Sequence, residues 1–258
     1  MPASGDRGRL AHVEIGVRDL GRAEALYTGL LGFPRTRTTA DDAGRPVAVL
    51  GSFPAVRLVE VGPAGRPTGW DADNRQRGIR HFGMKVADVD AWVARLRAAG
   101  VAFDLGPFDA VGGVRIAFFR DPDGTCLELV QGYVRHHNLW SEQLAQQEID
   151  GDRDWDGRPR FDHVAITVPD LDQALTFYAG RLGLGRIGQV VRPADENGFL
   201  ITNLRAAPAT LEVFSFDVAT HARDDAGEPD ALGLRAIGIT GAGADRTGPG
   251  DVALRRVD

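Results

Sequence analysis

Three histidines in this chain of 258 residues are each followed by a glutamate 47 to 49 residues later. The pairs are His12 with Glu60, His81 with Glu128 and His163 with Glu212. Imidazole nitrogens and carboxylate oxygens are common protein ligands of divalent metal ions. A glutamate placed beside a reacting group can also transfer protons. The repeated spacing makes these six residues the first candidates for chemistry.

The same predicted elements, a strand and then a helix, follow each histidine. The stretches HVEIGV from His12, HFGMKV from His81 and HVAITV from His163 alternate between apolar and other residues. That alternation predicts a half-buried strand. An aspartate follows seven residues after each histidine, and its carboxylate can accept a hydrogen bond from a free N–H of a helix that starts there. These N-cap positions are Asp19, Asp88 and Asp170.

The alternation also predicts where the candidate side chains point. Successive side chains of a strand face opposite sides of the sheet. The alternating apolar side chains of each strand must pack against the helices. Each histidine therefore faces the opposite side of its sheet. Leu127 and Leu129 flank Glu128 and assign this glutamate to the same side as its histidine. Glu14 and Lys85 share that side and are candidates for contacts around a site.

The chain contains three copies of one unit and the beginning of a fourth. The first three align without gaps from Ala11, Arg80 and Asp162. The fourth, GLRAIGIT at 233–240, matches GIRHFGMK at 78–85 but has Ala236 in place of His81. Its next residues are rich in glycine, which disfavours a helix. The chain ends before the position of a matching glutamate, so we expect this unit to be incomplete.

Composition excludes several classes of protein. The net charge is −6 without a long basic run, which argues against nucleic-acid and membrane partners. No apolar run approaches the ~20 residues that span a bilayer, and the N-terminus has no apolar signal-peptide core. With one cysteine, Cys126, an internal disulfide framework is excluded. We expect a cytoplasmic protein, in which Cys126 is a small buried residue.

The repeated unit resembles the vicinal oxygen chelate superfamily, which includes glyoxalase I, bleomycin-resistance proteins and extradiol dioxygenases. The segments HVEIGVRDL, RHFGMKVADV, DPDGTCLEL and HVAITVPDL carry the resemblance. It implies an α+β fold of tandem βαβββ modules that form two cup-shaped mixed β-sheets with helices outside. We expect a complete domain at residues 9–133, a linker at 134–160, and a truncated, degenerate domain at 161–258.

The resemblance also implies a set of metal ligands. Carried over residue by residue, the set is His12, Glu60, His81 and Glu128, with one divalent Fe, Mn, Ni, Co or Zn ion. The match at Glu60 requires a shift of two residues. His163 and Glu212 are interpreted as a remnant, because two ligands rarely retain a divalent ion. The C-terminal half is therefore expected to be metal-free.

The implied activity is that of a metal-dependent isomerase, epimerase or lyase acting on a small molecule with two adjacent oxygens. Glu60 and Glu128 would transfer the proton. A triad of His12, His81 and Glu128 would instead suit an extradiol-type dioxygenase, although Phe118 occupies the position of a tyrosine in those enzymes. A metal-free protein that sequesters an antibiotic is a third alternative, and a homodimer stays open. His136 and His137, in the expected linker, are interpreted as interface residues.

Overall fold

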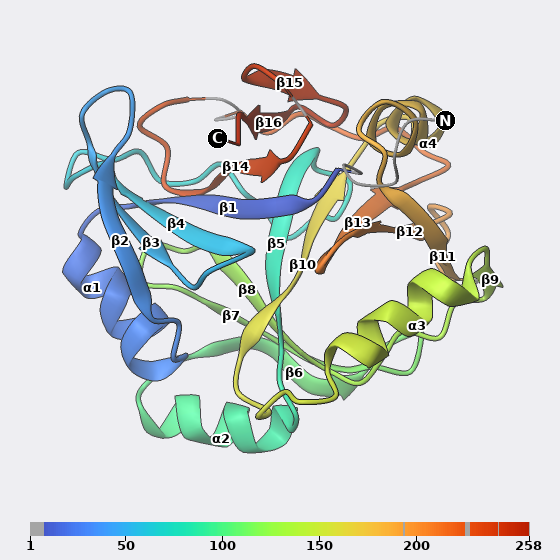
Figure 1. The fold of residues 1–258 in the computed structure, drawn as a ribbon, viewed down its shortest axis with the longest axis horizontal. Coiled ribbons are helices and arrows are strands. Elements are labelled where there is room, and N and C mark those ends of the chain that lie inside the picture. Colours follow the sequence, from blue (N-terminus) through green and yellow to red (C-terminus); the bar gives the residue numbers. More distant parts are fainter. Residues whose placement is uncertain (1–7, 193, 225–227, 242, 258) are drawn as a thin grey trace.

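The computed structural model describes residues 8–192, 194–224, 228–241 and 243–257. Its strands form one sheet of nine strands and one of seven. The helices lie at the outside of the molecule (Figure 1). This arrangement confirms the predicted α+β class with two mixed sheets.

The nine-stranded sheet combines the second and third repeats, in the order β6-β7-β8-β5-β10-β13-β12-β11-β9. The second repeat supplies β5 (Gly78–Lys85), β6 (Phe103–Asp109), β7 (Arg115–Arg120) and β8 (Cys126–Gln131). The third supplies β10 (Arg160–Thr167), β11 (Gly185–Val191), β12 (Leu200–Ala206) and β13 (Ala209–Ser215). Strands β5 and β10 pair antiparallel at its centre, and the short β9 (Asn138–Leu139) pairs with β11 (Figure 1).

The seven-stranded sheet combines the first repeat with the incomplete fourth. Its strands are β1 (Leu10–Val17), β2 (Arg35–Ala40), β3 (Pro46–Leu50), β4 (Ala55–Glu60), β14 (Gly233–Ile239), β15 (Arg246–Gly248) and β16 (Val252–Arg255). Strands β1 and β14 pair antiparallel, as β5 and β10 do. The red C-terminal strands lie beside the blue β1 in Figure 1. After β14, the described residues form the short β15 and β16 and no helix.

The repeats pair differently from the pairing that we expected from the sequence. We expected consecutive repeats to pair, the first with the second inside residues 9–133 and the third with the fourth inside 161–258. The sheets instead pair the second repeat with the third and the first with the fourth. The segment 61–77 connects β4 in one sheet to β5 in the other. Because all four central strands have similar sequences, their local pattern does not specify which two share a sheet.

The predicted helix starts are confirmed. Asp19, Asp88 and Asp170 each accept a hydrogen bond from the backbone N–H three residues later, at 2.7, 3.0 and 2.9 Å. They cap α1 (Leu20–Glu24), α2 (Val89–Ala98) and α4 (Leu171–Ala174). Helices α1 and α4 continue as the π-helical segments η1 (Ala25–Leu30) and η2 (Leu175–Arg181). The remaining α-helix of the described residues, α3 (Glu142–Gly151), lies in the expected linker.

The apolar faces of both sheets share one hydrophobic core. The alternating residues Val13, Ile15, Phe82, Met84 and Val164 are completely buried and belong to one cluster. Leu96 of α2 and Tyr178 of η2 belong to it as well. The core therefore occupies the helix side of the strands, and the histidines are directed to the opposite side.

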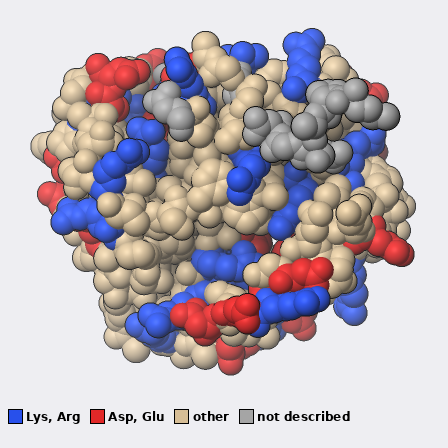
Figure 2. All heavy atoms as spheres, in the orientation of Figure 1, with Lys and Arg blue, Asp and Glu red and all other residues tan. Residues whose placement is uncertain are grey.

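The surface carries charges of both signs. On the face shown in Figure 2, basic and acidic side chains are interspersed among uncharged residues. Among the residues that the structure describes, no helix is both long enough and apolar enough to cross a membrane.

Candidate metal centre

The register between β5 and β10 brings His81 and His163 together in the middle of the nine-stranded sheet. His81 lies opposite Ala165, and His163 lies opposite Gly83. The two Nε2 atoms are 3.0 Å apart, and both residues are buried. A β-carbon on Gly83 would lie 2.0 Å from Cε1 of His163. The missing side chain of Gly83 thus leaves the space that the imidazole occupies.

Each neighbouring strand adds one glutamate. Glu128 of β8 has its Oε2 atom 3.0 Å from Nε2 of His81 and 2.9 Å from Nε2 of His163. Glu212 of β13 has its Oε2 atom 3.7 Å from Nε2 of His163. The four residues come from β5, β8, β10 and β13, two from each of the paired repeats.

The spacing of these atoms fits a divalent metal ion. The two Nε2 atoms and Oε2 of Glu128 form a triangle with sides of 2.9 to 3.0 Å. Ligand atoms about 2.1 Å from one ion and at right angles to each other would be ~3.0 Å apart. The ligand atoms of His81, His163 and Glu212 lie within 4.8 Å of one another. Two imidazoles and two carboxylates suit Fe, Mn, Co, Ni or Zn.

The electrostatics of the group follow from its burial and its charges. Burial would raise the pKa of Glu128, but the charges and hydrogen bonds of His81 and His163 lower this pKa to about 2. Burial would lower the pKa of His163, but Glu212, Asp162 and Glu128 raise it well above its ordinary value. Without an ion, His163 is therefore an imidazolium that holds the negative charge of Glu128.

A second group of charges orients the ring of His163. Oδ2 of Asp162 lies 2.9 Å from Nδ1 of His163. Lys85 has its Nζ atom 3.4 Å from Oδ1 of Asp162 and forms an ion pair with Glu148. When Nδ1–H donates to Asp162, a neutral imidazole presents the lone pair of Nε2 to the centre, as metal-binding histidines do. Lys85 thus lies near the centre, as expected, and acts through Asp162.

Aromatic rings surround the centre. Phe118 and Phe214 lie 5.4 and 5.9 Å from the ring of His81, measured between centroids. Phe199 packs edge-on against Phe214 and stacks on Phe216. These rings make the surroundings of the polar group apolar.

The structure does not bring His12 and Glu60 to this centre. His12 lies on β1 in the other sheet, with Arg57 and Arg255 among its charged neighbours. Oε2 of Glu60 accepts a hydrogen bond from the backbone N–H of Leu20 at 2.9 Å and satisfies the start of α1. Of the expected set of His12, Glu60, His81 and Glu128, the structure brings only His81 and Glu128 together. The reason is the pairing of the repeats, which places His12 and His81 in different sheets.

The structure places His163 and Glu212, which were interpreted as a remnant, beside His81 and Glu128. They complete the group that His81 and Glu128 begin. Sequence reasoning missed them as members of this site because it paired consecutive repeats. The signal was present, since His163 and Glu212 have the same spacing and the same facing as the other pairs.

The remaining candidate residues, Cys126, His136 and His137, lie outside the centre and have local contacts of their own. Burial raises the pKa of the Cys126 thiol to about 12, so it is not a thiolate at neutral pH. Nδ1 of His137 accepts a hydrogen bond from the backbone N–H of Val191 at 3.2 Å, which ties the linker to the edge strand β11. His136 is partly buried beside the same strand, where its side chain lies against Gly188.

A pair of βαβββ repeats with imidazoles and carboxylates converging between them defines a class of cup-shaped proteins. The chain belongs to the Glyoxalase/Bleomycin resistance protein/Dioxygenase superfamily, whose family description matches residues 9–129 and 160–245.

Among curated proteins, a lactoylglutathione lyase from Arabidopsis thaliana is 30% identical over 193 residues, which cover 73% of this chain and 59% of the relative. A lactoylglutathione lyase from Salmonella typhimurium is 29% identical over 130 residues, which cover 48% of this chain and 92% of the relative. The chain thus spans about three fifths of the length of the Arabidopsis relative.

Among solved structures, a mutant of glyoxalase I from Zea mays aligns over 97% of this chain and 92% of its own, with a TM-score of 0.69 and 20% identity. A putative dioxygenase from Bacillus subtilis covers 92% of this chain and 71% of its own, with a TM-score of 0.58 and 15% identity. At these identities the likeness shows the fold.

Proposed function

We propose that the chain is a divalent-metal-dependent enzyme of the glyoxalase type, a lyase or isomerase that transfers a proton on a small substrate with two adjacent oxygens. The ligands are His81, Glu128, His163 and Glu212. The observation that carries the proposal is the triangle of ligand atoms with sides of 2.9 to 3.0 Å. The lactoylglutathione lyases among the relatives support the same reaction class.

The chemistry requires a hydrogen on a carbon beside an oxygen to become acidic. A bound divalent ion polarises substrate oxygens and acidifies the neighbouring C–H. The protein residues then have to accept the proton, hold it and return it. Phe118 and Phe214 pack against the ring of His81 and make the surroundings of the group apolar.

The two glutamates have different roles. Glu128 lies within hydrogen-bond distance of both imidazoles and is fixed by them. Glu212 has one longer contact, 3.7 Å to His163, and can move without breaking a hydrogen bond of the group. We assign Glu128 as a permanent ligand and Glu212 as the residue that accepts the proton. Glu60, which caps α1, takes no part.

Metal content tests the ligand set. The purified chain is expected to hold about one divalent ion, and His81→Ala and Glu128→Ala are each expected to lose it. His12→Ala is the matched control, because His12 occupies in the other sheet the register position that His163 occupies in this one. Elemental analysis of the purified proteins gives the content and the identity of the metal. A metal lost with His12→Ala but kept with His81→Ala contradicts the assignment.

The reaction class is tested by two assays on the metal-loaded enzyme. Proton transfer predicts exchange of deuterium from D₂O into the carbon beside the carbonyl of small hydroxyketones, and loss of this exchange in Glu212→Gln. Oxygen uptake with catechols under Fe(II), in place of deuterium exchange, would identify a dioxygenase. Tight binding of a ligand by a metal-free native protein would identify a sequestering protein.

A further inference from the structure

The two sheets are built on the same plan, so every position of the metal centre has an equivalent in the seven-stranded sheet. Gly83 of β5 is paired with His163 and Glu128, and Gly238 of β14 is paired in the same way with His12 and Arg255. Ala165 of β10 is paired with His81 and Glu212, and Glu14 of β1 is paired with Ala236 and Arg57. The equivalents of the four proposed ligands are therefore His12, Ala236, Arg57 and Arg255.

The four proposed ligands and their four equivalents in the seven-stranded sheet carry charges of opposite sign. Both glutamates are replaced by arginines, Arg57 and Arg255, and one histidine is replaced by alanine. Guanidinium groups cannot bind a metal ion, but they bind carboxylate and phosphate oxygens through paired N–H donors. The same convergence of strands that suits a cation in one sheet suits an anion in the other.

Three buried polar nitrogens of the seven-stranded sheet have no hydrogen-bond partner among the described residues. Nε of Arg57, Nη1 of Arg235 and Nε2 of His12 are buried without a hydrogen bond. His12 and Arg235 are only 6 and 8% exposed. Burial and the charges of Arg57 and Arg255 lower the pKa of His12 to about 3, so its ring is neutral. Buried donors without partners are costly, and an acceptor that meets several at once relieves that cost.

One acidic side chain stands among three arginines. Glu14 has a carboxylate oxygen 3.9 Å from Arg57, 3.9 Å from Arg235 and 3.6 Å from Arg255. All three distances exceed a hydrogen bond. Asp245 also pairs with Arg255, at 3.2 Å. These two carboxylates leave the group of arginines with a positive charge.

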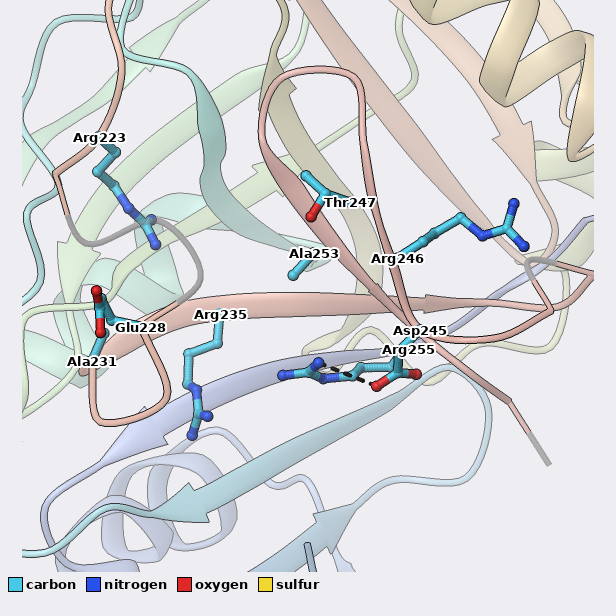
Figure 3. A pocket seen from close by; sticks show the side chains of 9 residues that line it. All are labelled: Arg223, Glu228, Ala231, Arg235, Asp245, Arg246, Thr247, Ala253 and Arg255. Carbon is cyan, nitrogen blue, oxygen red and sulfur yellow. Dashed lines mark hydrogen bonds and ion pairs between the residues drawn. The ribbon is translucent and has the colours of Figure 1, made fainter. Parts of the chain in front are cut away.

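A cavity of about 280 Å³ adjoins the group and is lined by Arg235, Arg255, Arg223 and Arg246, with Asp245 and Glu228 as its acidic residues. In Figure 3, Arg235 and Arg255 extend on one side of β14, and Arg246 points away from both. The volume is near the lower end of the ~300–1,000 Å³ typical of small-molecule sites. A small organic anion therefore has room beside the donors.

We propose that the seven-stranded sheet holds an anion site, in which Arg57, Arg235 and Arg255 bind the carboxylate or phosphate group of a small molecule. His12, whose Nε2 atom is buried without a hydrogen bond, lies on β1 opposite Gly238 of β14. The site lies in a different sheet from the metal centre and binds without a metal ion.

Isothermal titration calorimetry of the full chain treated with EDTA tests the site, with inorganic phosphate, succinate and the uncharged succinamide as probes at constant ionic strength. One equivalent of phosphate or of succinate is expected to bind, and succinamide is not. Binding of phosphate alone identifies a phosphorylated ligand, and binding of succinate alone identifies a carboxylate. Arg57→Gln and Arg255→Gln are each expected to weaken binding about tenfold or more.

Arg37→Gln is the matched control, because Arg37 is an exposed arginine on β2 of the same sheet and its loss changes the net charge equally. Circular dichroism checks that each variant is folded, and two separate variants keep the test valid if one of them is not. Equal binding of phosphate, succinate and succinamide overturns the proposal. An equal loss of binding in Arg37→Gln and Arg57→Gln overturns it too.

Discussion

At Glu128, charge and stability are closely linked. The two imidazoles lower its pKa from its ordinary value of 4.5 to about 2 in the metal-free protein. A carboxyl with a lowered folded pKa stabilises the fold above its unfolded pKa, and this stabilisation is lost as the pH falls through the folded pKa. Between pH 4.5 and 2 the EDTA-treated chain should lose roughly 3 kcal/mol through this group.

The measurement is the urea midpoint as a function of pH, for the wild type and for Glu128→Gln. The wild-type midpoint should fall more steeply than that of the variant between pH 4.5 and 2, because only the wild type has this carboxyl to protonate. Parallel curves for the two proteins would show that Glu128 does not carry the linkage.

Asp162 sets the orientation of a proposed ligand without being one. It accepts from Nδ1 of His163 at 2.9 Å, and Asp162→Asn removes the negative charge that favours this arrangement. Loss of such a partner typically weakens metal binding 10- to 100-fold. Competition titration with a metal-binding dye measures the affinity. Asp172→Asn on the exposed face of α4 is the control, and equal affinities in the two variants would contradict the role.

At the residue scale, sequence reasoning named two of the four members of the proposed centre. His81 and Glu128 could be predicted because a histidine and a glutamate on one face of a strand pattern have little other use. Glu60 could not be rejected, because its spacing from His12 matches the other pairs to within one residue. The register shows that Arg57 is the true equivalent of Glu212. The connection between β2 and β3 is shorter than the one between β11 and β12, which shifts that equivalence, and spacing alone does not reveal it.

At the scale of elements, the strand, the aspartate cap and the helix of each repeat follow from local sequence. The register shift between Ala165 and Ile166 in the pairing of β10 with β5 does not follow from local sequence. It leaves Arg80 without an opposite residue in the register, and Arg80 is buried with its guanidinium over Trp70. This local change in register fixes where His81 projects, and it depends on tertiary contacts that a strand pattern does not contain.

Gly83 of β5 provides a test of this register. A β-carbon there would lie 2.0 Å from Cε1 of His163, so Gly83→Ala must displace the proposed ligand. We expect Gly83→Ala to lose its metal, as measured by elemental analysis, with circular dichroism unchanged. Gly238→Ala is the matched control, because its β-carbon would meet His12 at 2.3 Å in the other sheet. A metal content that falls equally in both variants would contradict the prediction.

At the scale of the whole molecule, four similar repeats allow several pairings, and the sequence does not choose among them. The choice depends on how segments such as 61–77, which connects β4 to β5, route the chain between the sheets. Those connections lack the periodicity that made the strands predictable. Because the pairing decides which histidines meet, an error at this scale became an error in the residues of the site.

The pairing predicts which parts of the molecule respond to the metal. An ion held between the second and third repeats stabilises the state in which those repeats are paired. Removal of the metal by EDTA should therefore increase native-state amide hydrogen exchange in β5, β8, β10 and β13, while β1, β4 and β14 keep their protection. Hydrogen exchange read by mass spectrometry resolves these strands. Had consecutive repeats paired, β1 and β4 would respond together with β5 and β8, and β10 and β13 would not. That second pattern would contradict the pairing and the ligand set together. Phosphate or succinate added to the EDTA-treated chain should act on the other sheet and protect β1, β4, β14 and β16.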